Sequence, residues 1–518
     1  MKRRTPSRVI MLRIHSSALP DSFTLACMPF TPVASLKFER APHSLRTPHA
    51  AQRAAFARAE AASRPEDSRG LRLVSLSEVL TALSYALDLT GGQAAGHTVR
   101  TCMIGMRIAG ELGLPDDACA SLYDALLLKD AGSSSNAAYL TGIYDSDDRV
   151  IKPRLRWIDR KHRVSTAYHT ARSVGIGQSP WSRLTHFVGI LSDDAIGRNL
   201  IQIRSDRGAK VALRLGFPRT TAHAIRSLDE QWDGCGLPDG KRGDEIPLLS
   251  RIANLAQTVE AFRARNGVAH AMRVARARRG RWFEPRLVDI VSRWENDAQW
   301  WARLDSPDVS AEVLSLKPTN HVRLVDERGI DDVARAFADI IDAKSPFTYN
   351  HSTRVANYAC AIAERAGLAP EEIRRLRRAS LLHDMGKLGI SSRLLDKTGP
   401  LSRREREEMN RHPLYTWEVL SRVSAFSDFA RMAAMHHEKL DGSGYPWGVR
   451  GEKLDDATRI LCVADVFEAL TSARSYRAEM TPRAALRIIR REAGMELCPR
   501  AVEGLAAMVE ESPKQMVM

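Results

Sequence analysis

The sequence has few cysteines and few aromatic residues, and it has no long hydrophobic run. Its seven cysteines lie far apart and form no Cys-x-x-Cys pair, so the sequence predicts neither a disulfide framework nor a thiolate zinc site. No apolar stretch approaches the roughly 18 residues that a membrane helix needs. Unpaired cysteines are typical of a reducing compartment. We therefore expect a cytoplasmic protein with no membrane partner.

Acidic residues are too few to balance the basic ones, and much of the excess lies near the N-terminus. The 518 residues include 77 Lys and Arg against 62 Asp and Glu, a net charge of +15. Residues 1–70 hold 12 basic and 5 acidic side chains and seven of the 24 prolines. Such a tail is expected to be disordered. The remaining excess suits anionic ligands. Because no helix-turn-helix or zinc motif is found, we expect no DNA or RNA partner.

Two stretches of the sequence occur twice, in the same order. Residues 97–132 align with 351–386 at an offset of 254, with 12 of 36 positions identical. Residues 227–261 align with 435–469 at an offset of 208, with 13 of 35 identical. The two offsets differ by 46, so the first copy carries an insertion of that size between about 133 and 203. The chain is therefore a tandem duplication.

Each copy has the periodicity of helices and lacks the alternation of strands. Val355 and Ile362 belong to one apolar stripe at helical spacing, which Gly367 ends. Ser402 to Glu405 forms a capping box that begins a further helix, and we expect Pro413 to end or kink that helix. The class predicted is all-α.

Polar residues interrupt the apolar helices of the second copy at a few positions. A buried carboxylate such as Asp465 costs several kcal/mol unless it meets a cation or several donors. Imidazoles with carboxylates are the ligands of Fe, Mn or Zn, and an aspartate can bridge two ions roughly 3.5–4 Å apart to activate water. The candidate positions are His383, Asp384, His412, His436, His437 and Asp465.

The order of these motifs resembles the HD-GYP family, a branch of the HD metal-dependent phosphohydrolases. The similar segments are His383-Asp-Met-Gly-Lys387, Arg411-His-Pro413, His436-His-Glu438, Gly444-Tyr-Pro446 and Arg474-Ser-Tyr-Arg477. The resemblance covers about residues 330–510. It implies tandem HD-type helical domains and a cyclic di-GMP phosphodiesterase with a divalent metal centre, for which iron or manganese is expected.

Carried over position by position, the resemblance implies a role for each site residue. The six candidate residues become metal ligands, with Asp384 as the bridge, and Lys387 contacts the scissile phosphate. His351 is either a further ligand or an outer partner. Tyr445 with Gly444 and Pro446, and Arg474 with Arg477, are implied to bind substrate. Some relatives hold a third ion through a glutamate four residues before the position of His351. Here Phe347 stands at that position, so we expect two ions per chain. Thr416 replaces the usual glycine, and we expect a small effect on packing.

The first copy has lost most of this set. Lys129 stands opposite His383, Arg204 opposite His412, and Gln257 opposite Asp465, while Leu228 and Asp229 replace the histidine pair. Only His97 and Asp130 remain. We expect a degenerate copy that acts as a docking partner, dimer surface or ligand sensor. An anion held by Lys129 and Arg204 is a further alternative.

The expected domains are a disordered basic tail over 1–70, a degenerate copy over 71–300, a linker over 301–329 and a catalytic copy over 330–515. We expect either a homodimer or intramolecular pairing of the two HD-type domains. Two other functions stay open: a phosphohydrolase of the same type that acts on another nucleotide or phosphoester, and a non-catalytic cyclic-dinucleotide receptor.

Overall fold

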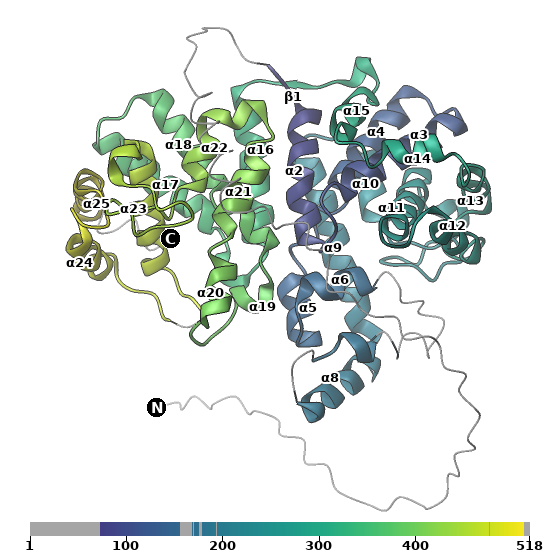
Figure 1. Ribbon diagram of the computed structural model, residues 1–518, viewed down its shortest axis with the longest axis horizontal. Coiled ribbons are helices and arrows are strands. Elements are labelled where there is room, and N and C mark those ends of the chain that lie inside the picture. Colours follow the sequence, from purple (N-terminus) through teal and green to yellow (C-terminus); the bar gives the residue numbers. More distant parts are fainter. Residues whose placement is uncertain are drawn as a thin grey trace, which may run out of the picture. The chain divides into compact units, whose positions relative to one another are not determined.

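Nearly all the regular structure is helical, as the sequence predicts (Figure 1). The computed structural model describes residues 73–155, 168, 170–175, 179–192, 194–475 and 477–511, so the predicted disorder of residues 1–70 lies outside them. Within the described residues the named strands are β1 (Val74–Ser75) and β2 (Leu324–Val325), which pair antiparallel. None of the helices described has both the length and the apolar character needed to cross a membrane.

The first copy consists of helices that recur in the second. They are α2 (Leu76–Thr90), α3 (His97–Leu112), α4 (Asp116–Leu128), α9 (Asp194–Arg214), α10 (Arg219–Arg226), α11 (Leu248–Asn266), α12 (Val268–Ala277) and α13 (Pro285–Ser292), with the 3-10 turn η1 (Gly243–Glu245). The predicted insertion contains α5 (Ala137–Tyr144), α6 (Asp148–Leu155), α8 (Pro180–Ser192) and the start of α9. Three elements lie between the two copies in the sequence: α14 (Ala298–Arg303), α15 (Val309–Ser315) and η2 (Thr319–His321).

The second copy repeats this order without the insertion. Its helices are α16 (Glu327–Asp342), α17 (His351–Arg365), α18 (Pro370–Leu382), α19 (Ser392–Leu395), α20 (Arg403–Met409), α21 (His412–Leu420), α22 (Ser427–Ala434), α23 (Asp456–Thr471), α24 (Pro482–Glu492) and α25 (Pro499–Glu511). Short 3-10 turns lie between them: η3 (Pro346–Thr348), η4 (Met385–Gly389), η5 (Ser424–Phe426) and η6 (Gly451–Lys453).

A pair of glycines shows that the two copies are built alike. A Cβ on Gly386 would lie 1.9 Å from the carbonyl oxygen of His412, and a Cβ on Gly132 would lie 1.9 Å from that of Arg204. Only glycine allows the backbones to approach so closely. The crossing that follows the His-Asp pair of the second copy therefore exists in the first copy too. It also confirms that Arg204 is the counterpart of His412.

The beginning of the third predicted helix is confirmed, and its end is a correction. Ser402 accepts a hydrogen bond from the Glu405 amide, and Glu405 accepts one from the Ser402 amide at 2.8 Å. The helix ends at Met409, earlier than predicted. Pro413 is the second residue of the next helix, α21, where its missing N–H costs nothing because first-turn amides have no intrahelical acceptor.

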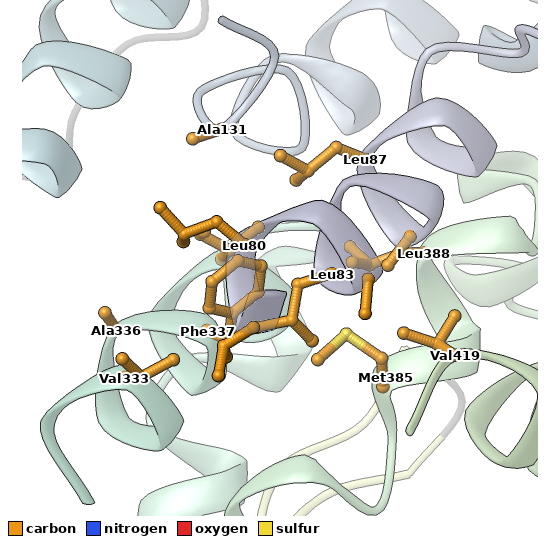
Figure 2. Packing of buried hydrophobic residues seen from close by; sticks show 14 of the residues in the cluster. Leu80, Leu83, Leu87, Ala131, Val333, Ala336, Phe337, Met385, Leu388 and Val419 are labelled. Carbon is orange, nitrogen blue, oxygen red and sulfur yellow. The ribbon is translucent and has the colours of Figure 1, made fainter. Parts of the chain in front are cut away.

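The hydrophobic cores of the two copies are continuous. Leu80, Leu83 and Leu87 of α2 lie in one cluster with Met385 and Leu388 of η4 (Figure 2). All five side chains are at most 1% exposed, and full burial of such a side chain contributes roughly 1.5–3 kcal/mol. The first copy therefore packs directly against the turn that follows Asp384.

Candidate metal centre

The candidate ligands come from five places in the second copy and converge on one point. His351 begins α17, His383 and Asp384 follow α18, and Lys387 lies in η4. His412 begins α21, His436 and His437 follow α22, and Asp465 lies in the middle of α23. His351, His383, Asp384, His412 and His436 are at most 2% exposed. The structure thus brings together all the residues that the sequence predicts as ligands.

Backbone carbonyls fix the orientation of three imidazoles. The Nδ1–H groups of His383, His412 and His436 each donate a hydrogen bond of 2.7 Å to a carbonyl three residues earlier, those of Ser380, Met409 and Ala433. In each ring the Nε2 atom is left facing the centre. An outer hydrogen bond that selects the tautomer and aims the other nitrogen is characteristic of metal-binding histidines.

Glu468 orients the fourth imidazole and was not assigned a role from the sequence. His351 Nδ1 lies 2.5 Å from Glu468 Oε2, which leaves His351 Nε2 facing the centre. Arg354 and Arg474 hold the carboxylate of Glu468 at 2.5 and 2.9 Å. The signal was present in the sequence, because Glu468 interrupts the same apolar helix three residues after Asp465.

The Nε2 atoms form two close pairs. Those of His351 and His383 are 3.3 Å apart, and those of His412 and His436 are 3.2 Å apart. Two ring nitrogens whose lone pairs point at each other over this distance repel unless a proton or a metal ion lies between or beside them. The arrangement of imidazoles therefore calls for cations.

Asp384 lies between the two histidine pairs. Its Oδ2 is 3.3 Å from His351 Nε2 and 3.4 Å from His383 Nε2, and its Oδ1 is 3.4 Å from His412 Nε2 and 3.7 Å from His436 Nε2. The Oδ1 atom is buried and accepts no hydrogen bond. A buried carboxylate oxygen without a donor costs free energy, which a metal ion at that oxygen would remove.

Asp465 completes the group on the side of His351. Its Oδ1 lies 3.5 Å from His351 Nε2 and 3.7 Å from His383 Nε2, and its Oδ2 lies 3.8 Å from His437 Nδ1. Two sets of donors result, with His351, His383 and Asp465 in one and His412, His436 and His437 in the other. Each set can hold an ion, and Asp384 has one oxygen near each. The donors present fit a pair of divalent ions.

Burial and neighbouring charges shift the pKa values of the cluster in opposite directions. Burial alone would raise the pKa of Asp384, but His383 and Lys387 hold it well below its usual range. Burial lowers the pKa of His412 to about 3 and that of His437 to about 4. For His383 burial acts downward too, but Asp384 and Asp465 outweigh it and raise the pKa to about 10. Without another cation these two carboxylates keep a proton on His383, and a metal ion would replace that proton.

Lys387 lies beside the cluster, and its ammonium is directed at Asp384. Its Nζ is 2.5 Å from Asp384 Oδ2, and the side chain is 19% exposed. It is therefore close to the centre and open to solvent on one side. An ammonium cannot coordinate a metal ion, so its place at the rim suits contact with an anion that reaches the ions.

The Gly-Tyr-Pro segment forms a loop over the histidines. The Glu438 carboxylate accepts hydrogen bonds of 2.8 Å from the amides of Trp447 and Val449, which fixes the loop. A Cβ on Gly444 would lie 2.5 Å from backbone atoms of His437 and Glu438, so a side chain cannot fit. The ring of Tyr445, next to Pro446, then lies 4.7 Å from that of His437, centroid to centroid.

The two arginines predicted to bind substrate have protein partners. Arg474 donates to Glu468 at 2.9 Å. Arg477 donates to the carbonyls of Ala469 and Leu470 at 2.5 and 3.0 Å, at the C-terminal end of α23. The Arg474 contact holds Glu468 beside the cluster, and the Arg477 contacts satisfy carbonyl groups at the end of α23. The phosphate-binding role of both side chains stays a prediction.

The first copy has the same backbone and different chemistry. Lys129 and Asp130 form a buried ion pair, and Arg204 pairs with Asp229 at 2.6 Å. Arg100 pairs with Glu260 as Arg354 does with Glu468. Among the residues the structure describes, every group of side chains that could hold a metal ion lies in the second copy.

Comparison with known proteins agrees with this geometry. The HD domain family model matches residues 191–287 and 335–499, one segment in each copy. Over 441 residues the chain is 39% identical to the 3'3'-cGAMP-specific phosphodiesterase 3 of Vibrio cholerae serotype O1, covering 85% of this chain and 96% of that enzyme. Over 207 residues it is 38% identical to the cyclic di-GMP phosphodiesterase response regulator RpfG of Xanthomonas campestris pv. campestris, covering 39% of this chain and 54% of RpfG.

A solved structure is similar as well. The crystal structure of the cyclic GMP-AMP-specific phosphodiesterase V-cGAP3 of V. cholerae matches with a TM-score of 0.60 at 35% identity, covering 85% of this chain and 98% of that one. The fold and site thus define a tandem HD-domain protein of the metal-dependent phosphohydrolase class. Within that class the chain belongs to the HD-GYP family of phosphodiesterases.

Proposed function

We propose that the second copy hydrolyses a phosphodiester bond of a cyclic dinucleotide at a two-metal centre. The observation that carries the proposal is the position of Asp384, whose two oxygens each lie within 3.4 Å of the Nε2 atom of a histidine from a different pair. One bridging carboxylate between two sets of nitrogen donors is the arrangement of two-metal phosphoester hydrolases.

The donor sets indicate which residues would hold the ions. His351, His383 and Asp465 would hold one ion, His412, His436 and His437 would hold the other, and Asp384 would contact both. Three donors besides Asp384 at each ion would leave room for water and phosphate oxygens. Iron or manganese suits imidazole and carboxylate donors. When bound, the ions supply a nucleophilic hydroxide at neutral pH and stabilise charge on the phosphate.

The side chains at the rim bind and orient the substrate. Lys387 Nζ moves from Asp384 to a non-bridging phosphate oxygen and stabilises the charge that develops there. The ring of Tyr445 lies over His437 at the entrance and offers a base an aromatic face. Arg474, together with Arg354, holds the Glu468 carboxylate in place and so keeps His351 Nε2 directed at the centre.

We rank 3'3'-cGAMP first and cyclic di-GMP second as substrate. The relative named as specific for 3'3'-cGAMP matches this chain over 96% of its own length, through both copies. RpfG, named as acting on cyclic di-GMP, matches over 54% of its length. Similarity over nearly the whole length of a relative supports its substrate more strongly than similarity over about half of one.

The test is direct hydrolysis by the whole chain. Protein purified without oxygen and loaded with Fe²⁺ or Mn²⁺ is incubated with 3'3'-cGAMP, cyclic di-GMP and cyclic di-AMP, and products are separated by chromatography. We expect turnover of the two guanine-containing nucleotides, faster for 3'3'-cGAMP, and none by Asp384→Asn. Chromatography also distinguishes a linear dinucleotide from mononucleotides. Binding of all three without turnover would favour a receptor, and turnover of only simple phosphoesters would favour another phosphohydrolase.

A further inference from the structure

Two neighbouring residues of the inserted helix α6 reach from the first copy into the second. The first is Asp148, whose side chain is fully buried. Its Oδ2 lies 3.0 Å from Lys344 Nζ, and its Oδ1 accepts a hydrogen bond of 2.9 Å from the Ser392 amide. Lys344 is 1% exposed and also donates to the carbonyl of Leu388 at 3.3 Å. One carboxylate thus contacts two segments of the second copy, and Lys344 connects it to a third.

The second residue, Arg149, joins two more points. Its guanidinium donates to the carbonyl of Gly389 at 2.7 Å and to the Glu408 carboxylate at 2.6 Å. The Asp147 carboxylate accepts hydrogen bonds from the same guanidinium, from Nη2 at 2.7 Å and from Nε at 3.1 Å, and so fixes its direction. Arginine suits this role because its planar fork donates to several acceptors at once.

The segments that α6 contacts are those that carry the metal centre. Lys344 lies between α16 and the start of α17, where His351 is found. Leu388 and Gly389 end η4, the turn that follows Asp384 and contains Lys387. Glu408 precedes Met409, whose carbonyl orients His412. Asp148 and Arg149 therefore contact segments that position residues of both histidine pairs. They also contact η4, the turn that follows Asp384.

The apolar contacts of the first copy act on the same turn. Met385 and Leu388 lie beside Leu83 of α2, in the same buried cluster as Leu80 and Leu87 (Figure 2). Asp384 and Lys387, the residues that alternate with them, point toward the centre. The catalytic turn thus has the metal centre on one side and the degenerate copy on the other.

The buried charge of Lys344 in the second copy is paired with a carboxylate of the first copy. Burial would raise the pKa of Asp148, but Lys344 and Lys152 hold it well below its usual range. Lys152 in turn donates to the carbonyls of Thr90 and Ser133 in the first copy at 3.0 and 2.8 Å. Removing one member of a buried ion network leaves an uncompensated charge, which is strongly destabilising.

We propose that helix α6 is a positioning element of the catalytic centre, acting through Arg149 and Asp148. It holds η4, α20 and the segment before His351 in the arrangement in which Asp384 reaches both histidine pairs. The degenerate copy is therefore required for the geometry of the intact one. The proposal rests on the proposed function only for its kinetic readout, because the metal-binding readout does not need a substrate.

The experiment compares Arg149→Met with Arg154→Met in the full chain. Arg154 lies on the same helix and donates to the carbonyl of Arg172 within the insertion, so it is a matched control. We expect Arg149→Met to weaken Mn²⁺ binding, measured by titration calorimetry, about 10-fold or more, as loss of outer support does at metal sites. We also expect kcat at saturating Mn²⁺ to fall roughly 10- to 100-fold with KM within about twofold, while Arg154→Met matches the wild type.

A second variant separates positioning from folding. Glu408→Gln weakens the contact on α20, and its side chain is 39% exposed, so folding should be retained. We expect it to reproduce part of the loss in Mn²⁺ affinity with an unchanged unfolding midpoint. Wild-type Mn²⁺ affinity in both Arg149→Met and Glu408→Gln would overturn the proposal. If the wild type hydrolyses no cyclic dinucleotide but the Mn²⁺ affinities differ as expected, the proposed function fails and the positioning role stands.

Discussion

Lys129 and Asp130 form a buried ion pair at the point of the first copy where the second copy places His383 and Asp384. The ammonium supplies there the positive charge that an ion would supply in the second copy. A cation built into the chain makes a metal ion unnecessary at that point and repels one. The first copy thus keeps the aspartate of the site, pairs it with a cation of the chain and lacks most of the other candidate ligands.

The first prediction follows from this asymmetry. Asp384→Asn should lose bound metal and all measurable turnover, because the bridging carboxylate is lost. Asp130→Asn should keep both, since the amide oxygen can still accept from Lys129. Metal content and turnover of the two purified variants check this. Equal losses in the two would contradict a single catalytic copy.

The second prediction concerns Lys387. Lys387→Met should retain the full metal content and lose roughly 10²–10³ in kcat, the effect of removing one charge-stabilising donor. Lys387→Arg, which keeps the charge, should recover part of the rate. Loss of metal from Lys387→Met would instead give the residue a structural role through its contact with Asp384.

The third prediction is the number of ions. The two donor sets predict two ions per chain, both in the second copy. At Phe347, the position of the additional glutamate in some relatives, the side chain has no donor atom. Elemental analysis of anaerobically purified protein checks the number. Three equivalents per chain, or metal retained by Asp384→Asn, would contradict it.

The fourth prediction concerns Thr416, which does more than fill space. Its buried hydroxyl donates to the His383 carbonyl at 2.8 Å and accepts from the Gly386 amide at 2.9 Å. Thr416→Val should lower stability by about 1–3 kcal/mol, because two buried backbone groups lose their partner. It should also weaken Mn²⁺ binding. Thr416→Ser keeps the hydroxyl and should match the wild type in thermal unfolding and Mn²⁺ titration.

The fifth prediction is a pH dependence that originates in the first copy. Burial raises the pKa of Asp88 to about 7, although Lys129 opposes this. Its Oδ1 accepts from Thr98 at 2.7 Å, while its buried Oδ2 has no partner. Because the folded pKa lies above the unfolded one, ionisation costs stability as pH rises from about 4, and the cost is complete above pH 7.

Asp88→Asn removes this cost. Its stability relative to wild type should rise between pH 4 and pH 7 by an amount on the order of 4 kcal/mol and then stay level. Scanning calorimetry at several pH values measures it. A difference that does not change with pH would show that Asp88 is ionised throughout.

The sequence by itself determined the all-α class and the duplication, and it predicted the candidate ligands. Helical periodicity and caps such as Ser402–Glu405 are local, and the ligands lie in ordered motifs that remain readable without a structure. An ion-binding residue must be of a particular chemical type, so His383, Asp384 and Asp465 are visible as exceptions within apolar stripes. The capping box likewise placed the start of α20 correctly.

Only the tertiary structure decided what supports that set. Arg149 and Glu408, or His351 and Glu468, are more than 100 residues apart, and no periodicity connects them. Thr416 acts on backbone atoms of His383 and Gly386, which leave no mark in the sequence. Pro413 was compatible with the end of one helix or the first turn of the next, and in the folded protein it lies in the first turn of α21. A residue type shows whether a side chain can bind a metal ion, so candidate ligands can be recognised in the sequence. The contacts that orient these ligands join residues far apart in the chain, and they form only when the two copies pack together.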